Sequence, residues 1–324
     1  MRKTKIIATL GPKSETKEMI QALFNEGVDI FRLNLSHGDI DWHKEVVNRI
    51  SEVAPNAEIL IDTRGPEIRL GDFDGMIEIK EGDEIIFGEG YVPISYDLTK
   101  SIKKGDKIAI DSGMLFVEVV EIDGKIVKTK SLDNWHISAR RHVNLPGERV
   151  DMNTIPEKDR EDLRKFQGDK RIDHVALSFA RTQEDIIEAQ NLMPHAKIIA
   201  KIENCEGVEN FLSILDQSFG IMIARGDLGI ETELEELPVL QRRMLRKIRH
   251  LDKFAVVATE MLESMVKNPR PTRAEVSDIA TAVFEKADAV MLSQETAMGN
   301  YPIRAVSIMR KIIEYTEEEM CFLR

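Results

Sequence analysis

The sequence predicts an α/β protein: a (β/α)8 barrel of the TIM type with a small all-β, barrel-like domain inserted after the third strand. Eight short apolar runs alternate with amphipathic stretches along the 324 residues, as in folds where helices join parallel strands. The alternation is interrupted once, between residues 71 and 142. Without these 72 residues 252 remain, close to the roughly 250 of an ordinary barrel of this kind.

The eight apolar runs are rich in Ile, Val, Ala and Phe and lack regular alternation with polar residues. This pattern is typical of strands buried on both faces of a parallel sheet. The expected strands are 3–10, 28–35, 57–64, 172–179, 196–203, 219–226, 254–261 and 288–295.

Helical patterns lie between most of these runs. In the first of them, Met19, Ile20, Leu23 and Phe24 recur at helical spacing before a stop at Gly27. Strand–helix alternation implies parallel strands with right-handed crossovers. The expected helices are 14–27, 181–195, 238–252, 271–286 and 301–320.

The interrupting segment is rich in Gly-Asp and Asp-Gly pairs, which favour tight turns between short strands. Its expected strands are 76–80, 84–87, 107–110, 115–122 and 125–130. We therefore divide the chain into a catalytic barrel (1–70 and 143–324) and an inserted β-rich lid domain (71–142).

Composition excludes several classes of protein. The formal charge of −12 argues against nucleic acid as the main partner, but not against a small anionic substrate held by local Arg and Lys side chains. No apolar run approaches the roughly 20 residues of a membrane helix, and the start lacks a signal peptide's apolar segment. Two cysteines, Cys205 and Cys321, cannot form a disulfide framework. We expect a cytoplasmic protein without a membrane partner.

Barrels of this kind carry their active sites at the C-terminal ends of the strands. Each expected strand end here is polar, whereas the strand interiors are largely apolar. One such residue alone is as readily a helix cap, but eight polar ends together predict a catalytic site. The residues are Thr9, Arg32, Asn34, Ser36, Asp62, Thr63, Ser178, Lys201, Glu203, Arg225, Asp227, Thr259, Ser293 and Glu295.

Two carboxylates suggest a magnesium site. Lys201 and Glu203 are two residues apart and share one face of a strand, and Asp227 follows the next strand. Glu203 and Asp227 would hold Mg²⁺ and leave positions for substrate oxygens. Lys201 would stabilise negative charge in a transition state. The alternative is a Lys–Glu salt bridge at the barrel rim.

Four oxygen-bearing side chains suggest a second, hard cation, namely Asn34, Ser36, Asp62 and Thr63. Strand-end capping explains them equally well. The glycine-flanked turn 224–229 offers backbone N–H groups to a carboxylate or phosphate, although such a sequence is usually only a turn. No Walker A or GxGxxG pattern occurs.

Several long motifs resemble those of the pyruvate kinase family, and the resemblance covers nearly the whole chain. They are 4–12 (TKIIATLGP), 31–38 (FRLNLSHG), 62–69 (DTRGPEIR), 143–147 (VNLPG), 200–204 (AKIEN), 223–229 (IARGDLG), 259–265 (TEMLESM) and 269–275 (PRPTRAE). The resemblance implies phosphoryl transfer from phosphoenolpyruvate to ADP, giving pyruvate and ATP with Mg²⁺ and K⁺ as cofactors.

The resemblance also implies residue roles. Catalysis would use Lys201, Arg32 and Thr259, and Glu67 is the residue typical of K⁺-dependent members. Mg²⁺ would lie on Glu203 and Asp227, and K⁺ on Asn34, Ser36, Asp62 and Thr63. Phosphoenolpyruvate would contact Arg32, Lys201, Ala224, Arg225, Gly226, Asp227, Thr259 and Ser293. ADP would lie near Thr9, Pro12, Arg32, His37, Arg69 and Arg141, beneath a closing lid.

Some residues depart from the family's pattern. Arg64 and Arg141 stand where lysine is usual, His142 and Gln294 where glycine is usual, and Glu260 where glutamine is usual. We also expect the protein to lack the family's C-terminal α/β domain, to have no effector regulation through such a domain and to show altered oligomerisation, with pairing through barrel helices.

Two other functions fit the sequence less well. One is a Mg²⁺-dependent aldolase-type barrel enzyme acting on phosphoenolpyruvate or pyruvate, against which the inserted β domain argues. The other is a catalytically weakened, ligand-binding paralogue, which Glu260 and Gln294 support.

Overall fold

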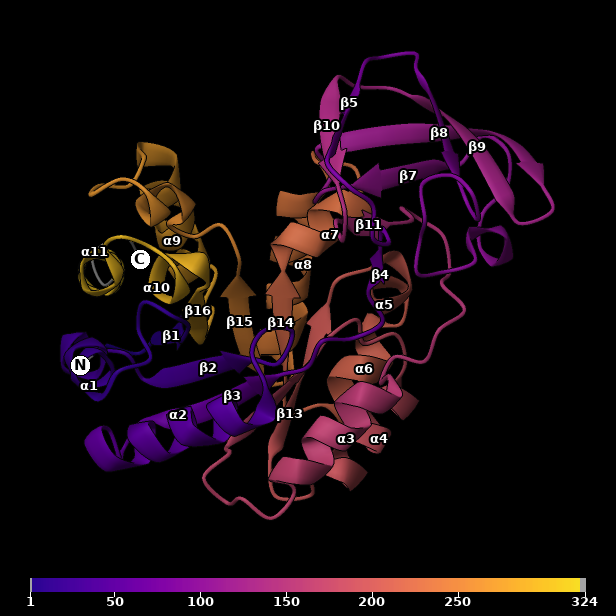
Figure 1. The fold of residues 1–324 in the computed structure, drawn as a ribbon. Coiled ribbons are helices and arrows are strands. Elements are labelled where there is room, and N and C mark those ends of the chain that lie inside the picture. Colours follow the sequence, from indigo (N-terminus) through magenta and orange to yellow (C-terminus); the bar gives the residue numbers. More distant parts are fainter. Residues whose placement is uncertain (1, 321–324) are drawn as a thin grey trace.

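The computed structural model describes residues 2–320 and confirms the predicted barrel. Eight parallel strands close in the order β1-β16-β15-β14-β13-β12-β3-β2 (Figure 1). Their bounds are β1 (Lys5–Thr9), β2 (Ile30–Asn34), β3 (Glu58–Asp62), β12 (His174–Leu177), β13 (Lys197–Ile202), β14 (Gly220–Ala224), β15 (Phe254–Ala258) and β16 (Ala289–Leu292). All eight predicted strands are present, and each is shorter than the apolar run that contains it.

Helices surround the strands and bury the larger of two apolar cores against them, while a smaller core fills the barrel interior. The helices are α1 (Lys17–Glu26), α2 (Ile40–Val53), α3 (Glu157–Phe166), α4 (Gln183–Leu192), α6 (Phe211–Gln217), α8 (Leu237–His250), α9 (Arg273–Phe284) and α11 (Pro302–Glu319). The sequence did not identify α2, α3 or α6. In α3 only Leu163 and Phe166 are buried apolar residues, too few for a clear periodic signal.

Three short helices begin directly after barrel strands, at the end where the site is expected. They are α5 (Cys205–Glu209), α7 (Arg225–Glu231) and α10 (Gln294–Ala297). The glycine-flanked turn predicted at 224–229 is therefore the beginning of α7.

The insertion is an antiparallel, curled sheet with its own apolar core. Six strands follow the order β4-β11-β7-β8-β9-β6, and β10 pairs with β5. Their bounds are β4 (Ile68–Arg69), β5 (Met76–Ile79), β6 (Glu84–Phe87), β7 (Lys107–Ile110), β8 (Leu115–Asp123), β9 (Ile126–Ser131), β10 (Trp135–Ser138) and β11 (His142–Asn144). The lid lies beyond the C-terminal end of β14, over one side of the barrel mouth (Figure 1).

The two chain segments that join barrel and lid pair with each other. Ile68 of β4 is opposite Val143 of β11 in an antiparallel arrangement. The lid sheet thus extends into both connecting segments, and the domain division at 70/71 and 142/143 stays a prediction.

The opposite end of the barrel contains a charged cluster. His174 Nε2 lies 2.9 Å and Lys5 Nζ 2.7 Å from the carboxylate of Glu58. The rings of Phe219 and Phe254 pack against His174. The hydrogen bond from His174 lowers the pKa of Glu58 to about 2, with a further contribution from Lys5.

We expect Glu58→Gln to destabilise the protein in a pH-dependent way. A lowered folded-state pKa adds stability that is present above the ordinary pKa of 4.5 and is lost as the pH falls toward 2. The free energy of unfolding of the variant should be about 1 kcal/mol below that of wild type near pH 7, because solvent screening reduces the contribution of the ion pair. This difference should vanish near pH 2. Denaturant unfolding of both proteins across this range measures it, and a difference independent of pH would contradict the expectation.

No helix among residues 2–320 is both long enough and apolar enough to cross a membrane.

Candidate active site

Three oxygen atoms hold the ammonium group of Lys201 at the C-terminal end of β13. Lys201 Nζ lies 3.1 Å from Asp62 Oδ1, 3.0 Å from Glu203 Oε1 and 2.7 Å from Ser178 Oγ. Burial opposes the charge of Lys201, but Asp62 and Glu203 outweigh burial and raise its pKa above the ordinary value. Lys201 is therefore a fixed, permanently charged group.

Asp62 is fully buried and joins two cations. Its Oδ2 accepts a hydrogen bond from Arg32 Nε at 2.6 Å, and its Oδ1 faces Lys201. Arg32 and Lys201 together outweigh burial and lower the pKa of Asp62. Arg32 also donates to Thr9 Oγ1 at 3.0 Å, which fixes the guanidinium on the side of β1.

Glu203 and Asp227 form the acidic part of the site. Glu203 Oε2 accepts the backbone N–H of Phe179 at 2.7 Å. Asp227 Oδ1, in α7, lies 4.0 Å from Nδ1 of the lid residue His142. Burial raises the pKa of both carboxyl groups against the opposing effect of Lys201, that of Glu203 to about 7.

With Asp62, three carboxylates face only two cations, Lys201 and Arg32. When all five groups are ionised, the cluster keeps an excess negative charge. A divalent cation would neutralise this excess, and carboxylate oxygens are the ligands that Mg²⁺ prefers. Among residues 2–320, no group of three or more His, Cys, Asp or Glu residues suits a metal. A magnesium ion here would thus rest on two carboxylates and take its other ligands from substrate and water.

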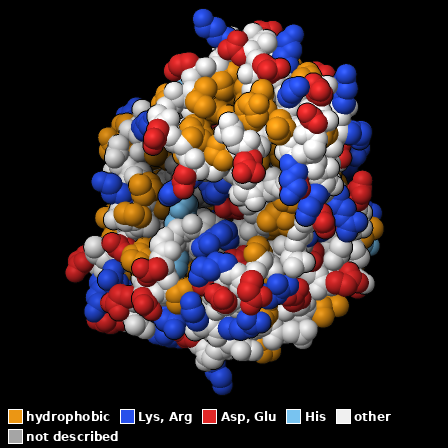
Figure 2. Space-filling model, turned by 45° about the vertical axis from the view of Figure 1, so that its right-hand side comes forward, with side chains coloured by type: hydrophobic (Ala, Val, Ile, Leu, Met, Phe, Trp, Pro, Cys, Tyr) orange, Lys and Arg blue, Asp and Glu red, His pale blue; other side chains and the backbone are white. Residues whose placement is uncertain are grey.

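Of these groups, Arg32, Lys201, Glu203 and Asp227 face a pocket of about 600 Å³ between the barrel mouth and the lid. The molecular surface is hollowed between the lid, above, and the barrel, below, with basic and histidine side chains along the hollow (Figure 2). Of the predicted site residues, the pocket brings together Arg32, Asn34, Ser36, His37, Thr63, Arg69, Arg141, Ser178, Lys201, Glu203, Ala224, Asp227 and Thr259.

Arg225 and Gly226 do not line this pocket, and the Arg225 side chain is directed away from it. Its NH1 pairs with Asp278 of α9 at 2.5 Å, and its NH2 donates to the carbonyl of Thr259 at 2.6 Å. Gly226 N donates to Thr259 Oγ1 at 2.8 Å. The Arg225 guanidinium therefore braces α7 against α9.

Five other predicted residues lie outside the pocket lining, namely Thr9, Pro12, Asp62, Ser293 and Glu295. Thr9 Oγ1 is bonded to Leu292 O at 2.8 Å and to Arg32, so Thr9 acts by positioning the arginine. Asp62 lies behind Lys201 and Arg32. Pro12 is exposed on the loop after β1. Ser293 N donates to the buried carboxylate of Glu295 at 2.7 Å.

The predicted hard-cation cluster is brought partly together. Asn34, Ser36 and Thr63 line the pocket beside Glu67, whereas both Asp62 oxygens already accept hydrogen bonds. Three hard oxygens near two carboxylates fit a monovalent cation, with Asp62 contributing mainly its charge.

Comparison with known proteins identifies the family. The model of the pyruvate kinase barrel domain matches residues 1–306. The chain belongs to the pyruvate kinase family. It is 42% identical to the pyruvate kinases of Staphylococcus aureus strains USA300 and COL, over 96% of this chain and 56% of each relative. The chain thus spans about half the length of the curated relatives it matches. A crystal structure of pyruvate kinase from Cryptosporidium parvum superposes with a TM-score of 0.93 at 39% identity, covering 98% of this chain and 70% of that one.

The structure shows where the departures from the pyruvate kinase pattern lie. Glu260 is exposed and lies outside the active-site pocket, so its added charge does not face a substrate held there. Gln294 does line the pocket. Arg141 NH1 pairs with Asp111 at 3.1 Å, which holds its guanidinium at the lid side of the cleft.

Phe179 and His142 are site residues whose roles sequence reasoning missed. Phe179 has a φ of 53° and aims its backbone N–H at Glu203. Its neighbour Gly65 is required, because a Cβ there would lie 2.7 Å from the Phe179 ring. No sequence signal reports such backbone geometry. The departure from glycine at His142 was the one available signal for that residue.

Proposed function

We propose that this chain transfers the phosphoryl group of phosphoenolpyruvate to ADP, giving pyruvate and ATP, with Mg²⁺ and K⁺ as cofactors. The observation that carries the proposal is the buried, charged Lys201 beside Glu203 and Asp227 at the floor of the pocket between barrel and lid. Family membership supports the same assignment.

Mg²⁺ on Glu203 and Asp227 would neutralise substrate oxygens and orient them for transfer. Lys201 and Arg32 would face the phosphoryl group in flight and stabilise its charge. Both cations are already oriented by Asp62, so little reorganisation accompanies the reaction. The bond between phosphorus and the enol oxygen breaks as a bond to the terminal phosphate oxygen of ADP forms.

The enolate left behind must take up a proton on carbon to become pyruvate. The Thr259 hydroxyl lines the pocket, accepts from Gly226 N and donates to Ala258 O at 2.6 Å. Glu295 is fully buried, and its oxygens accept backbone N–H groups of Leu262 and Ser293. Thr259 is therefore better placed than Glu295 to pass on the proton.

ADP would lie between the barrel residue His37 and the basic side chains Arg69 and Arg141, which line the same pocket. A lid closed over this space would keep water from competing for the phosphoryl group. We also place the protein in the cytoplasm and infer pairing through its barrel helices, as the sequence suggests.

The direct test is pyruvate formation from phosphoenolpyruvate, ADP and Mg²⁺ by the purified chain. Turnover is expected, and it should require both ADP and the divalent cation. Pyruvate released without ADP, or folded protein that binds phosphoenolpyruvate without turnover, would refute the proposed reaction.

We expect Glu67→Lys to abolish dependence on K⁺. Glu67 lines the pocket beside the oxygen cluster, so a lysine ammonium there would supply the positive charge of the missing cation. In wild type, replacing Na⁺ by K⁺ should raise kcat/KM at least tenfold, an effect of about 1.4 kcal/mol. The variant should be equally active in both salts. If K⁺ still activates the variant as it does wild type, the K⁺ site does not lie at this oxygen cluster.

We expect kcat/KM to fall on the acid side near pH 7, well above the range of an ordinary glutamate. Burial raises the pKa of Glu203 to about 7 in the metal-free site, so protons compete with the divalent cation as the pH falls. Increasing the Mg²⁺ concentration should shift the acid limb to lower pH. If the acid limb of the pH profile does not shift with the Mg²⁺ concentration, a group other than Glu203 causes it.

A further inference from the structure

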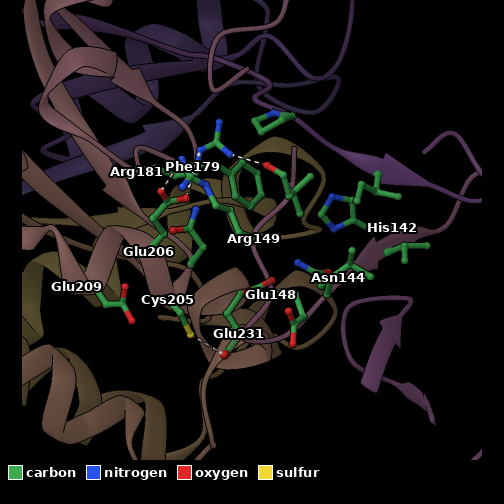
Figure 3. Close-up of a pocket in the computed structure, with 17 residues that line it drawn as sticks. His142, Asn144, Glu148, Arg149, Phe179, Arg181, Cys205, Glu206, Glu209 and Glu231 are labelled. Atoms are coloured by element: carbon green, nitrogen blue, oxygen red, sulfur yellow. Dashed lines mark hydrogen bonds and ion pairs between the residues drawn. The ribbon is translucent and has the colours of Figure 1, made fainter. Parts of the chain in front are cut away.

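A second pocket, of about 220 Å³, lies at the root of the lid, where the chain leaves and re-enters the barrel (Figure 3). We call it the hinge pocket. His142 and Asn144 belong to the lid strand β11, whereas the other defining residues follow β12, β13 and β14. Six lining residues define it: His142, Asn144, Phe179, Cys205, Glu209 and Glu231. Figure 3 shows the lid residues on one side of the cavity and Cys205 and Glu209 on the other.

Three buried polar atoms of the hinge-pocket lining have no hydrogen-bond partner, and one of them, Glu206 Oε2, lies 3.9 Å from Arg181 Nε. Asn144 is 5% exposed, and its Oδ1 is buried without a partner. His142 Nε2 is also buried without a hydrogen-bond partner. Buried polar groups left unsatisfied are costly and uncommon, so a ligand that bonds to them gains affinity.

The charges of the lining favour a cation. Arg149 pairs with Glu206 at 3.3 Å, and Arg181 donates to backbone carbonyls of the loop after β11. Glu209, at the exposed edge, and Glu231 form no ion pair among the described residues. Burial raises the pKa of Glu231 to about 8, against a hydrogen bond from Asn144, and an incoming positive charge would favour its ionised form.

The remaining lining fits an apolar body. The ring of Phe179 stands in the cavity with Pro66 and Leu145 nearby, and an aromatic face attracts cations. The volume is below the usual range of drug-sized sites. We propose that the hinge pocket binds a small organic cation, an amidinium or ammonium on a compact apolar group.

Such a ligand would bridge the lid and the barrel. His142 and Phe179 line both the hinge pocket and the active-site pocket, and the Phe179 backbone holds Glu203. A bound cation would therefore fix β11 against the loop that positions Glu203. The effect of this ligand on activity rests on the proposed function, but the binding of the ligand to the hinge pocket does not.

Calorimetric titration with benzamidine tests the binding, with neutral benzamide and anionic benzoate as comparisons. Wild type should bind one benzamidine saturably, and benzamide and benzoate at least about tenfold more weakly, the usual advantage of a charge-assisted contact. Glu231→Gln should weaken benzamidine binding by about tenfold or more. Glu235→Gln, an exposed neighbour outside the lining of this pocket, should leave it unchanged.

Two measurements locate the ligand without any turnover. Benzamidine should slow alkylation of Cys205, followed by peptide mass spectrometry, and should slow hydrogen exchange at 142–144. If turnover is established, benzamidine should also change KM for phosphoenolpyruvate in wild type and not in Glu231→Gln. No saturable binding, equal binding of the neutral analogue, or binding unaffected by Glu231→Gln would overturn the proposal whether or not the chain is a kinase.

Discussion

Lys201→Met is expected to reduce phosphoryl transfer by about a thousandfold or more, while phosphoenolpyruvate still binds. Lys201 is a buried cation that pairs with Asp62 and Glu203, and methionine keeps its length but removes the charge that would stabilise the transferring phosphoryl group and the enolate. Losing one preorganised donor to a developing charge typically costs 10²–10³-fold, and a full charge costs more. Single-turnover pyruvate formation measures the chemical step directly.

Two further variants make this result interpretable. Lys197→Met lies on the same strand, but its ammonium is exposed and rests 4.8 Å from the Phe219 ring, so activity should be retained. Lys201→Arg keeps the charge but not the compact geometry that fits between Asp62 and Ser178, and it should still lose about 10²-fold. A Lys201→Met protein that folds normally and turns over within tenfold of wild type would exclude Lys201 from catalysis.

Glu203→Gln is expected to abolish turnover almost as completely and to weaken divalent-cation binding by about 10²-fold. Glutamine retains the acceptor for the Phe179 N–H but loses the charge that a divalent cation would neutralise. It also leaves Lys201 with one counter-ion fewer. Electron paramagnetic resonance of bound Mn²⁺ reports the affinity without requiring turnover.

The matched control is Glu184→Gln, which removes an exposed carboxylate of α4 that does not line the pocket and should change neither readout. If Glu203→Gln loses activity but binds Mn²⁺ with full affinity, Glu203 is not a ligand of the metal. Its role would then be to position Lys201.

The sequence was most informative where one physical rule dominates. Strands buried on both faces must be apolar throughout, and the barrel places all their polar ends at one mouth. The alternation of runs therefore predicted all eight strands, and nine of the predicted polar strand-end residues line the pocket. The sequence did not predict α3, because this mostly charged helix has only two buried apolar residues, too few to show helical periodicity.

Other features depend on where distant segments meet. The 223–229 motif predicted Arg225 as a substrate ligand, and only the structure shows that its side chain pairs with Asp278, 53 residues away. Asp62 was predicted to be part of a hard-cation site, and only the structure shows that its two oxygens accept hydrogen bonds from Arg32 and Lys201. A charged side chain takes the nearest compensating partner, and that partner is set by packing across the barrel.

By itself, the sequence determined the barrel, the inserted β domain and the identity of the charged groups at the mouth, because burial period and strand polarity are local properties of the chain. Tertiary structure alone decided the sharing of charge among Lys201, Asp62, Glu203 and Asp227, since their pKa values depend on distances between strands and on burial. It alone also created the hinge pocket, because that cavity exists only where β11 of the lid meets the loops after three barrel strands.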